Sequence, residues 1–126
     1  MRMNRLGNSD LIVSAVGAGT WAMGGDFFGA TDDKKCVDSL CASLDHGVNL
    51  IDTAPIYGRG HSEELVGKAI QGRRDKVVLA TKVGLAYGAH PNGGKGRCLK
   101  PEGIAWEIEQ SLRRLGTDYI DLYQIH

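Results

Sequence analysis

The sequence predicts an α/β fold of the parallel (β/α) barrel (TIM-barrel) type, here about half a barrel, preceded by an N-terminal β-hairpin. Two observations predict it. Short, nearly all-apolar runs, as expected for strands covered on both faces, alternate with segments whose apolar residues recur at helical spacing. The predicted four strands and three helices in 126 residues are about half of a complete barrel, which takes roughly 250 residues. No linker or repeat is visible, so residues 1–126 are expected to form this half-barrel without an internal domain boundary.

The chain begins with a predicted hairpin and a short strand. Residues 6–13 carry two apolar pieces around a Gly-Asn pair, which is typical of the turn between antiparallel strands. Residues 15–19 are small and apolar and predict the first strand of the sheet, followed by a glycine-rich loop over residues 22–30. Residues 17–22 also match the G-x-G-x-x-A fingerprint of dinucleotide-binding domains. That site needs a helix directly after the glycines, and the next helix is expected only near Thr31.

Two helices and two strands follow in alternation. Thr31 is expected to cap the first helix, because two aspartates follow it in the first turn, and Gly47 is expected to end it. A strand is expected over residues 48–52. Ser62 is expected to cap the second helix, which has two glutamates in its first turn, and the next strand is expected over residues 76–81.

A loop, a helix and a strand complete the pattern. Residues 84–99 form a polar, glycine-rich loop that is long for a compact fold and is therefore a candidate for function or mobility. Pro101 suits the first turn of the third helix, and the last strand is expected over residues 119–125. The apolar stripe of this helix is expected to consist of Ile104, Ile108, Leu112 and Leu115.

The composition argues against several functions. The 15 basic and 15 acidic residues cancel, which disfavours a nucleic-acid or membrane partner. The N-terminus lacks the apolar core of a signal peptide, and no apolar run is long enough to span a bilayer. The 3 cysteines contain no C-x-x-C pair, so no metal site is expected and a reducing, cytoplasmic location fits best. The histidines that lack metal-ligand spacing, and are expected to be solvated or capping residues, are His46, His61 and His90.

Chemically active residues lie at the ends of the predicted strands. Asp52, Lys82 and His126 each end an apolar run, and Tyr57 lies in the loop just after Asp52. The carboxyl ends of parallel barrel strands share one rim, where active sites form. Each residue alone has a plain structural explanation, such as a loop cap, an exposed strand end or a packed ring. Their common position at strand ends predicts that the four side chains converge.

These four residues can be given roles in the reduction of a carbonyl group. A free phenol holds its proton too tightly for efficient exchange at neutral pH, and a nearby ammonium favours the phenolate. Lys82 would supply this charge to Tyr57, and Asp52 would keep Lys82 charged and in place. His126 would donate a hydrogen bond to the substrate oxygen, and Tyr57 would act as the general acid, or as the base in reverse. No metal is needed, but the hydride must come from a cofactor, because no side chain donates one.

The motifs that carry these residues resemble those of the aldo-keto reductase family. They are Gly19-Thr20-Trp21 and the runs NLIDTAPIYG (49–58), SEELVG (62–67), LATK (79–82), SLRRLG (111–116) and DLYQIH (121–126). Together they make the whole chain similar to the N-terminal half of such a reductase, truncated after the fourth strand.

The resemblance implies a hairpin-plugged (β/α)₈ barrel that uses NADPH, or less often NADH, without a Rossmann domain. The implied catalytic tetrad is Asp52, Tyr57, Lys82 and His126. The implied cofactor contacts, near the nicotinamide, are Gly19, Thr20, Trp21 and Asp52. The implied substrate contacts are Trp21, Tyr57 and His126. The family's later loops, which hold the pyrophosphate and the adenosine end, have no counterpart in this sequence.

We therefore expect an NAD(P)H-dependent oxidoreductase that reversibly reduces an aldehyde or ketone, including sugar-type carbonyls, to an alcohol. Its partner would be a small-molecule carbonyl substrate, and the sequence does not predict its oligomeric state. Three alternatives stay open. The chain could be a regulatory relative that binds nucleotide and a membrane protein, a barrel enzyme in which Lys82 forms a Schiff base, or a non-catalytic half-barrel that pairs with another chain.

Overall fold

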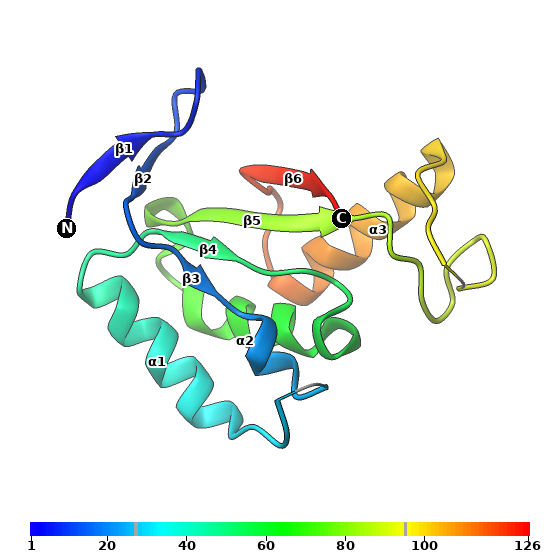
Figure 1. Ribbon diagram of the computed structural model, residues 1–126, viewed down its shortest axis with the longest axis horizontal. Coiled ribbons are helices and arrows are strands. Elements are labelled where there is room, and N and C mark those ends of the chain that lie inside the picture. Colours follow the sequence, from blue (N-terminus) through cyan, green and yellow to red (C-terminus); the bar gives the residue numbers. More distant parts are fainter. Residues whose placement is uncertain (27, 95) are drawn as a thin grey trace.

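The computed structural model describes residues 1–26, 28–94 and 96–126, so Phe27 and Lys95, in the two predicted glycine-rich loops, lie outside it. The central element is a parallel sheet with the strand order β3-β4-β5-β6. Its strands are β3 (Ala18–Gly19), β4 (Leu50–Asp52), β5 (Val78–Val83) and β6 (Leu122–Ile125). The connecting helices are α1 (Asp33–Asp45), α2 (His61–Ile70) and α3 (Pro101–Leu115). The helices lie along one side of the sheet (Figure 1), which confirms the predicted order and the partial barrel.

The N-terminal hairpin is confirmed, but its first strand lies earlier in the chain than the apolar pattern predicted. Strands β1 (Met3–Arg5) and β2 (Ile12–Ser14) pair antiparallel. Asn49 ties this hairpin to the start of β4, because its Oδ1 accepts from the Ser14 amide at 2.7 Å and its Nδ2 donates to the Ile12 carbonyl at 2.9 Å. The hairpin therefore sits where the strands begin, at the end opposite the rim.

The hydrophobic core lies between the sheet and the helices. Ile51 and Leu79, from the two central strands, are fully buried on the helix side. Burial of such apolar side chains contributes roughly 1.5–3 kcal/mol each to folding. The core cluster consists of Leu40, Ile51, Val66, Ala69, Ile70, Val77, Leu79 and Leu115. Among the described residues, no helix has the length and apolar character required to cross a bilayer.

Two predicted helix caps are wrong by one or two residues. Asp32, rather than Thr31, caps α1 by accepting a hydrogen bond from the Lys35 amide at 3.1 Å. Gly60, with φ 100°, precedes α2, so Ser62 lies inside the first turn and is fully buried. Aspartate and threonine are both good caps, and only the local backbone path decides between neighbours.

The predicted apolar stripe of α3 is also wrong in part. The residues that this helix buries are Gly103, Glu107, Ser111 and Leu115, so only Leu115 belongs to both sets. The Glu107 carboxylate is buried because it accepts a hydrogen bond from the Gly84 amide at 3.1 Å. Beside it, His90 is 3% exposed, so it is neither solvated nor a cap as predicted. Paired polar groups can replace apolar ones on a buried face, and a pattern of apolar residues does not reveal this.

Candidate active site

The carboxyl ends of the strands bring three of the predicted residues to one rim. Asp52 is the last residue of β4, and His126 directly follows β6. Lys82 lies inside β5, one residue earlier than a strand end, and its register partner on β6 is Gln124. Alternation along β6 places Gln124 and His126 on the same face, toward Asp52 and Lys82.

The Lys82 ammonium is the centre of the site. Its Nζ donates to Asp52 Oδ2 at 2.8 Å, to the Thr53 carbonyl at 2.9 Å and to the Tyr57 hydroxyl at 3.1 Å. The side chain is 13% exposed. A lysine has three protons to donate, and each of these acceptors takes one. Because the phenol oxygen accepts from Lys82, the phenol's own proton is left for another acceptor.

Two interlocked loops hold Tyr57 in place. The short 3₁₀ helices η1 (Trp21–Gly24) and η2 (Tyr57–Gly60) follow β3 and β4, and their backbones touch. A β-carbon on Gly58, where φ is 60°, would lie 2.5 Å from the Gly24 carbonyl oxygen, so only glycine fits there. The Gly58 amide also donates to Asp26 Oδ2 at 2.9 Å. The loop that carries Tyr57 is thus fixed to the loop that carries Trp21.

A small cavity opens beside Tyr57. Its volume is about 330 Å³, and it is lined by Trp21, Ile56, Tyr57, Leu85 and His126. The Trp21 ring lies 6.2 Å from the Tyr57 ring, and the His126 ring meets Tyr57 edge-on at 5.9 Å. A carbonyl group in this cavity would have a phenol and an imidazole within reach of its oxygen.

The electrostatics of the rim favour the neutral form of the His126 imidazole. Partial burial lowers the pKa of His126 below its ordinary value, the Lys82 charge lowers it further, and Asp52 opposes both effects. A neutral imidazole carries one N–H donor and one acceptor nitrogen. His126 can therefore donate a hydrogen bond at neutral pH without adding a second cation beside Lys82.

The predicted cofactor contacts divide into open and buried positions. Gly19 is exposed next to Asp52, its register partner, and a β-carbon there would have no described atom within 4 Å. Thr20 is fully buried, and its hydroxyl donates to the Asp52 carbonyl at 3.1 Å and accepts from Ser62 Oγ at 2.8 Å. Thr20 therefore braces β3 against β4, while Gly19 and Trp21 are exposed.

Sequence reasoning missed Gln124 as a member of the site. Its Nε2 lies 3.1 Å from Asp52 Oδ1, so the two oxygens of that carboxylate have different donors. The signal that could have found it is the alternation of side chains in the DLYQIH run, which puts Gln124 on the face of His126.

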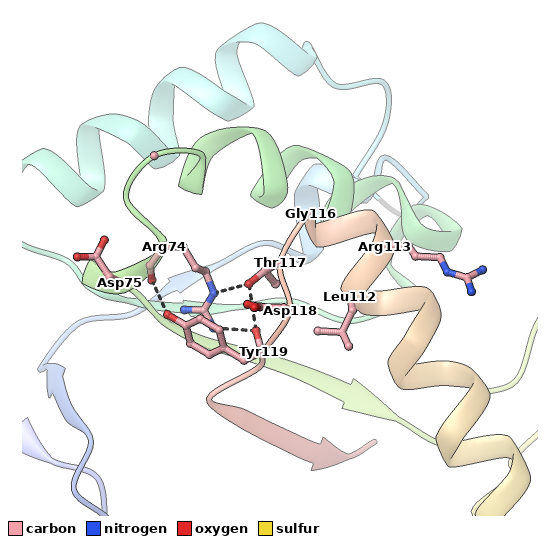
Figure 2. A pocket seen from close by; sticks show the side chains of 9 residues that line it. Arg74, Asp75, Leu112, Arg113, Gly116, Thr117, Asp118 and Tyr119 are labelled. Atoms are coloured by element: carbon pink, nitrogen blue, oxygen red, sulfur yellow. Dashed lines mark hydrogen bonds between the residues drawn. The ribbon is translucent and has the colours of Figure 1, made fainter.

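A larger cavity lies away from this chemistry. It has a volume of about 820 Å³ and lies around Arg74, in the short 3₁₀ helix η3 (Arg74–Lys76) before β5 (Figure 2). The Arg74 guanidinium donates to Asp121 Oδ2 at 2.7 Å and to the Tyr119 carbonyl at 2.9 Å, and it stacks on the Tyr119 ring. These charges pair with each other, so the arrangement ties the start of β5 to the start of β6. The part of the chain that the structure describes also contains no group of three potential metal-ligating side chains.

Comparisons with known proteins show which family the chain resembles. The family model described as "Aldo/keto reductase family" matches residues 15–126. The chain is 48% identical to "Aldo-keto reductase YhdN" of Bacillus subtilis and 41% identical to "NADH-specific methylglyoxal reductase" of Escherichia coli. All of this chain is covered in both comparisons, but only 38% and 42% of those relatives.

A solved structure shows the same likeness in three dimensions. It is an aldo-keto reductase from Klebsiella pneumoniae in complex with NADPH, which is 42% identical to this chain. The TM-score is 0.73, with 91% of this chain and 36% of that chain covered. The chain thus spans about two fifths of the length of the proteins it resembles.

Proposed function

The chain belongs to the aldo/keto reductase family, and on that premise we propose that the whole protein is an NAD(P)H-dependent oxidoreductase that reduces a small aldehyde or ketone. In this proposal the 126 residues supply the first half of the barrel and the proton-transfer machinery. Tyr57 is the general acid in reduction and the general base in alcohol oxidation. In this proposal the protein acts in the cytoplasm.

One observation carries the proposal, namely that Lys82 Nζ bridges Asp52 and Tyr57. The ammonium contacts Asp52 Oδ2 at 2.8 Å and the Tyr57 hydroxyl at 3.1 Å. The phenolate that forms when Tyr57 gives up its proton would lie directly beside a fixed positive charge, which favours that transfer. His126 would hold the substrate oxygen near the hydroxyl by donating its N–H.

The rim fits the nicotinamide end of the cofactor. The indole of Trp21 lines the 330 Å³ cavity, and a β-carbon built on Gly19, two residues earlier, would meet no described atom within 4 Å, which leaves space for a planar ring. When bound, the nicotinamide supplies the hydride that no side chain can donate. NADPH is the first choice, because a relative's structure contains it, and NADH is the second, because another relative is named NADH-specific.

The cavity supports a small carbonyl substrate. Its volume of about 330 Å³ and its mainly apolar lining suit a few carbon atoms around one polar group. Methylglyoxal, which one relative is named for reducing, is the first compound to test. Other aldehydes and sugar-type carbonyls follow.

The test is an isotope experiment on the whole protein. NADPH deuterated at the transferable position is mixed with methylglyoxal, and the product is examined by mass spectrometry and NMR. Deuterium on the former carbonyl carbon, with no adduct on Lys82 after borohydride treatment, is the expected result. A reduced adduct on Lys82 would instead favour the Schiff-base alternative. Tight NADPH binding without turnover on any carbonyl would favour the regulatory one.

A further inference from the structure

The Asp52 carboxylate is held by two donors of different kinds. Its Oδ2 accepts from the Lys82 ammonium at 2.8 Å, and its Oδ1 accepts from Gln124 Nε2 at 3.1 Å. Only the amide nitrogen of a glutamine can donate to a carboxylate, so the orientation of this side chain follows from its partner. Gln124 reaches Asp52 from β6, past the intervening strand β5.

The second donor restricts how the carboxylate can turn. The last torsion of an aspartate is broad, so a carboxylate held at one oxygen can rotate and lengthen that contact. Held at both oxygens, Asp52 keeps Oδ2 directed at Lys82. A hydrogen bond from a neutral donor also stabilises the charged carboxylate without adding a cation that would compete with Lys82.

A neutral hydrogen-bond donor suits position 124 better than a charged or an apolar side chain. A lysine or arginine in place of Gln124 would pair with Asp52 and draw it away from Lys82. An ionised glutamate would repel Asp52, since like charges at this separation disfavour each other's charged form. An apolar side chain would leave Oδ1 without this partner.

Building on the proposed function, we infer that Gln124 is a positioning residue for proton transfer. By holding the Asp52 carboxylate in its orientation, it keeps Lys82 Nζ at the Tyr57 hydroxyl. It does not touch the substrate in this scheme and acts through Asp52 alone. The inference therefore concerns the rate of turnover and its dependence on pH, and not the binding of cofactor.

The test uses Gln124→Met and Gln124→Glu in the whole protein. The reduction of methylglyoxal by NADPH is followed from pH 5 to 8. The kcat of each variant is divided by the kcat of the unaltered protein at the same pH. Gln124→Met should lower kcat about tenfold at every pH, which is the order expected for one hydrogen bond to a charged group. KM and the dissociation constant of NADPH should stay within about twofold, because neither ligand contacts this side chain.

Gln124→Glu gives a signature that a merely structural role would not produce. A protonated glutamate can donate to Asp52 Oδ1 as the amide does, whereas an ionised one cannot. The kcat of Gln124→Glu, divided by that of the unaltered protein, should therefore approach one near pH 5 and fall steeply above about pH 6. The introduced carboxyl group, which lies beside the Asp52 carboxylate, ionises in this range. If Gln124→Met does not fold, this nearly isosteric variant still supplies the readout.

Tyr123→Phe is the matched control. It alters the same strand on the opposite face, where the Tyr123 hydroxyl is buried and has no hydrogen-bond partner among the described residues. Its kcat ratio should be near one and independent of pH. A Gln124→Met protein with unchanged kcat, or a Gln124→Glu ratio that does not vary with pH, would overturn the positioning role. An unaltered protein that transfers no hydride would overturn the proposed function and this role together.

Discussion

Replacing Lys82 with methionine should remove most of the catalytic rate while leaving the fold in place. The substitution keeps the length and most of the volume of the side chain but removes its charge. Lys82 Nζ lies 3.1 Å from the Tyr57 hydroxyl and 2.8 Å from Asp52 Oδ2. The ammonium is therefore the charge closest to the phenolate that develops when Tyr57 gives up its proton.

The expected size of the effect follows from this distance. At an effective dielectric constant of about 20, unit charges 3.1 Å apart interact by roughly 5 kcal/mol. The charge on the phenol is only partly developed in the transition state, so we expect a loss of about 3–4 kcal/mol, or a 10²- to 10³-fold decrease in kcat.

The assay is steady-state oxidation of NADPH by the whole protein with saturating carbonyl, alongside a fluorescence titration of NADPH. The control is Lys68→Met, which removes an exposed lysine from α2 and should leave kcat unchanged. A kcat for Lys82→Met within threefold of the unaltered protein would refute the reasoning, because the ammonium would then not assist Tyr57. A melting temperature near that of the unaltered protein excludes unfolding as the cause.

Three further outcomes are expected. Arg114→Ala should lower the free energy of unfolding by about 3–5 kcal/mol in urea titrations, because the fully buried Glu63 loses the guanidinium whose Nε donates to it at 2.6 Å. Gly58→Ala should lower both stability and kcat, because the added β-carbon would lie 2.5 Å from the Gly24 carbonyl oxygen and force the Tyr57 loop to shift. NMR titration of His126 should give a pKa below about 6.5. The unfolded chain then binds this proton more readily, so His126 lowers the free energy of unfolding as the pH falls below about 6.5 and has no such effect at higher pH, where it is neutral in both states.

Controls for these three outcomes come from the same chain. Arg113→Ala breaks an exposed ion pair with Glu109 and should cost less than about 1 kcal/mol, so an equal cost at both arginines would argue against a buried charge pair. Gly72→Ala places alanine at a positive φ but causes no clash. If Gly72→Ala lowered kcat as much as Gly58→Ala, the contact between the two loops would not explain the effect at Gly58. The pKa of His126 should rise in Lys82→Met, because the Lys82 charge lowers it in the unaltered protein. A fall in this pKa would contradict that cause.

The features that sequence predicted well are those set by periodicity and by strand ends. Parallel strands must present their carboxyl ends on one edge, so residues such as Asp52 and Lys82 could be placed together without coordinates. The helix order and the hairpin followed from apolar spacing and turn residues.

The missed features depend on how separate segments meet. Gln124 has no chemical signature in a strand, and its contact with Asp52 depends on the register of β6 against β5. Glu63 looks like a surface residue that complements the helix dipole, but it is fully buried and also accepts from Thr81 at 2.7 Å. Such partners come from distant parts of the chain, and local propensity carries no information about them.

The most direct test of the account is Tyr57→Phe in the whole protein. This change removes one oxygen atom, the atom that accepts from Lys82 Nζ at 3.1 Å. Carbonyl reduction should fall by roughly 10²- to 10⁴-fold, the usual contribution of a general acid, while the dissociation constant of NADPH stays within about twofold. Turnover that survives in this variant would contradict the assignment of Tyr57 as the proton donor.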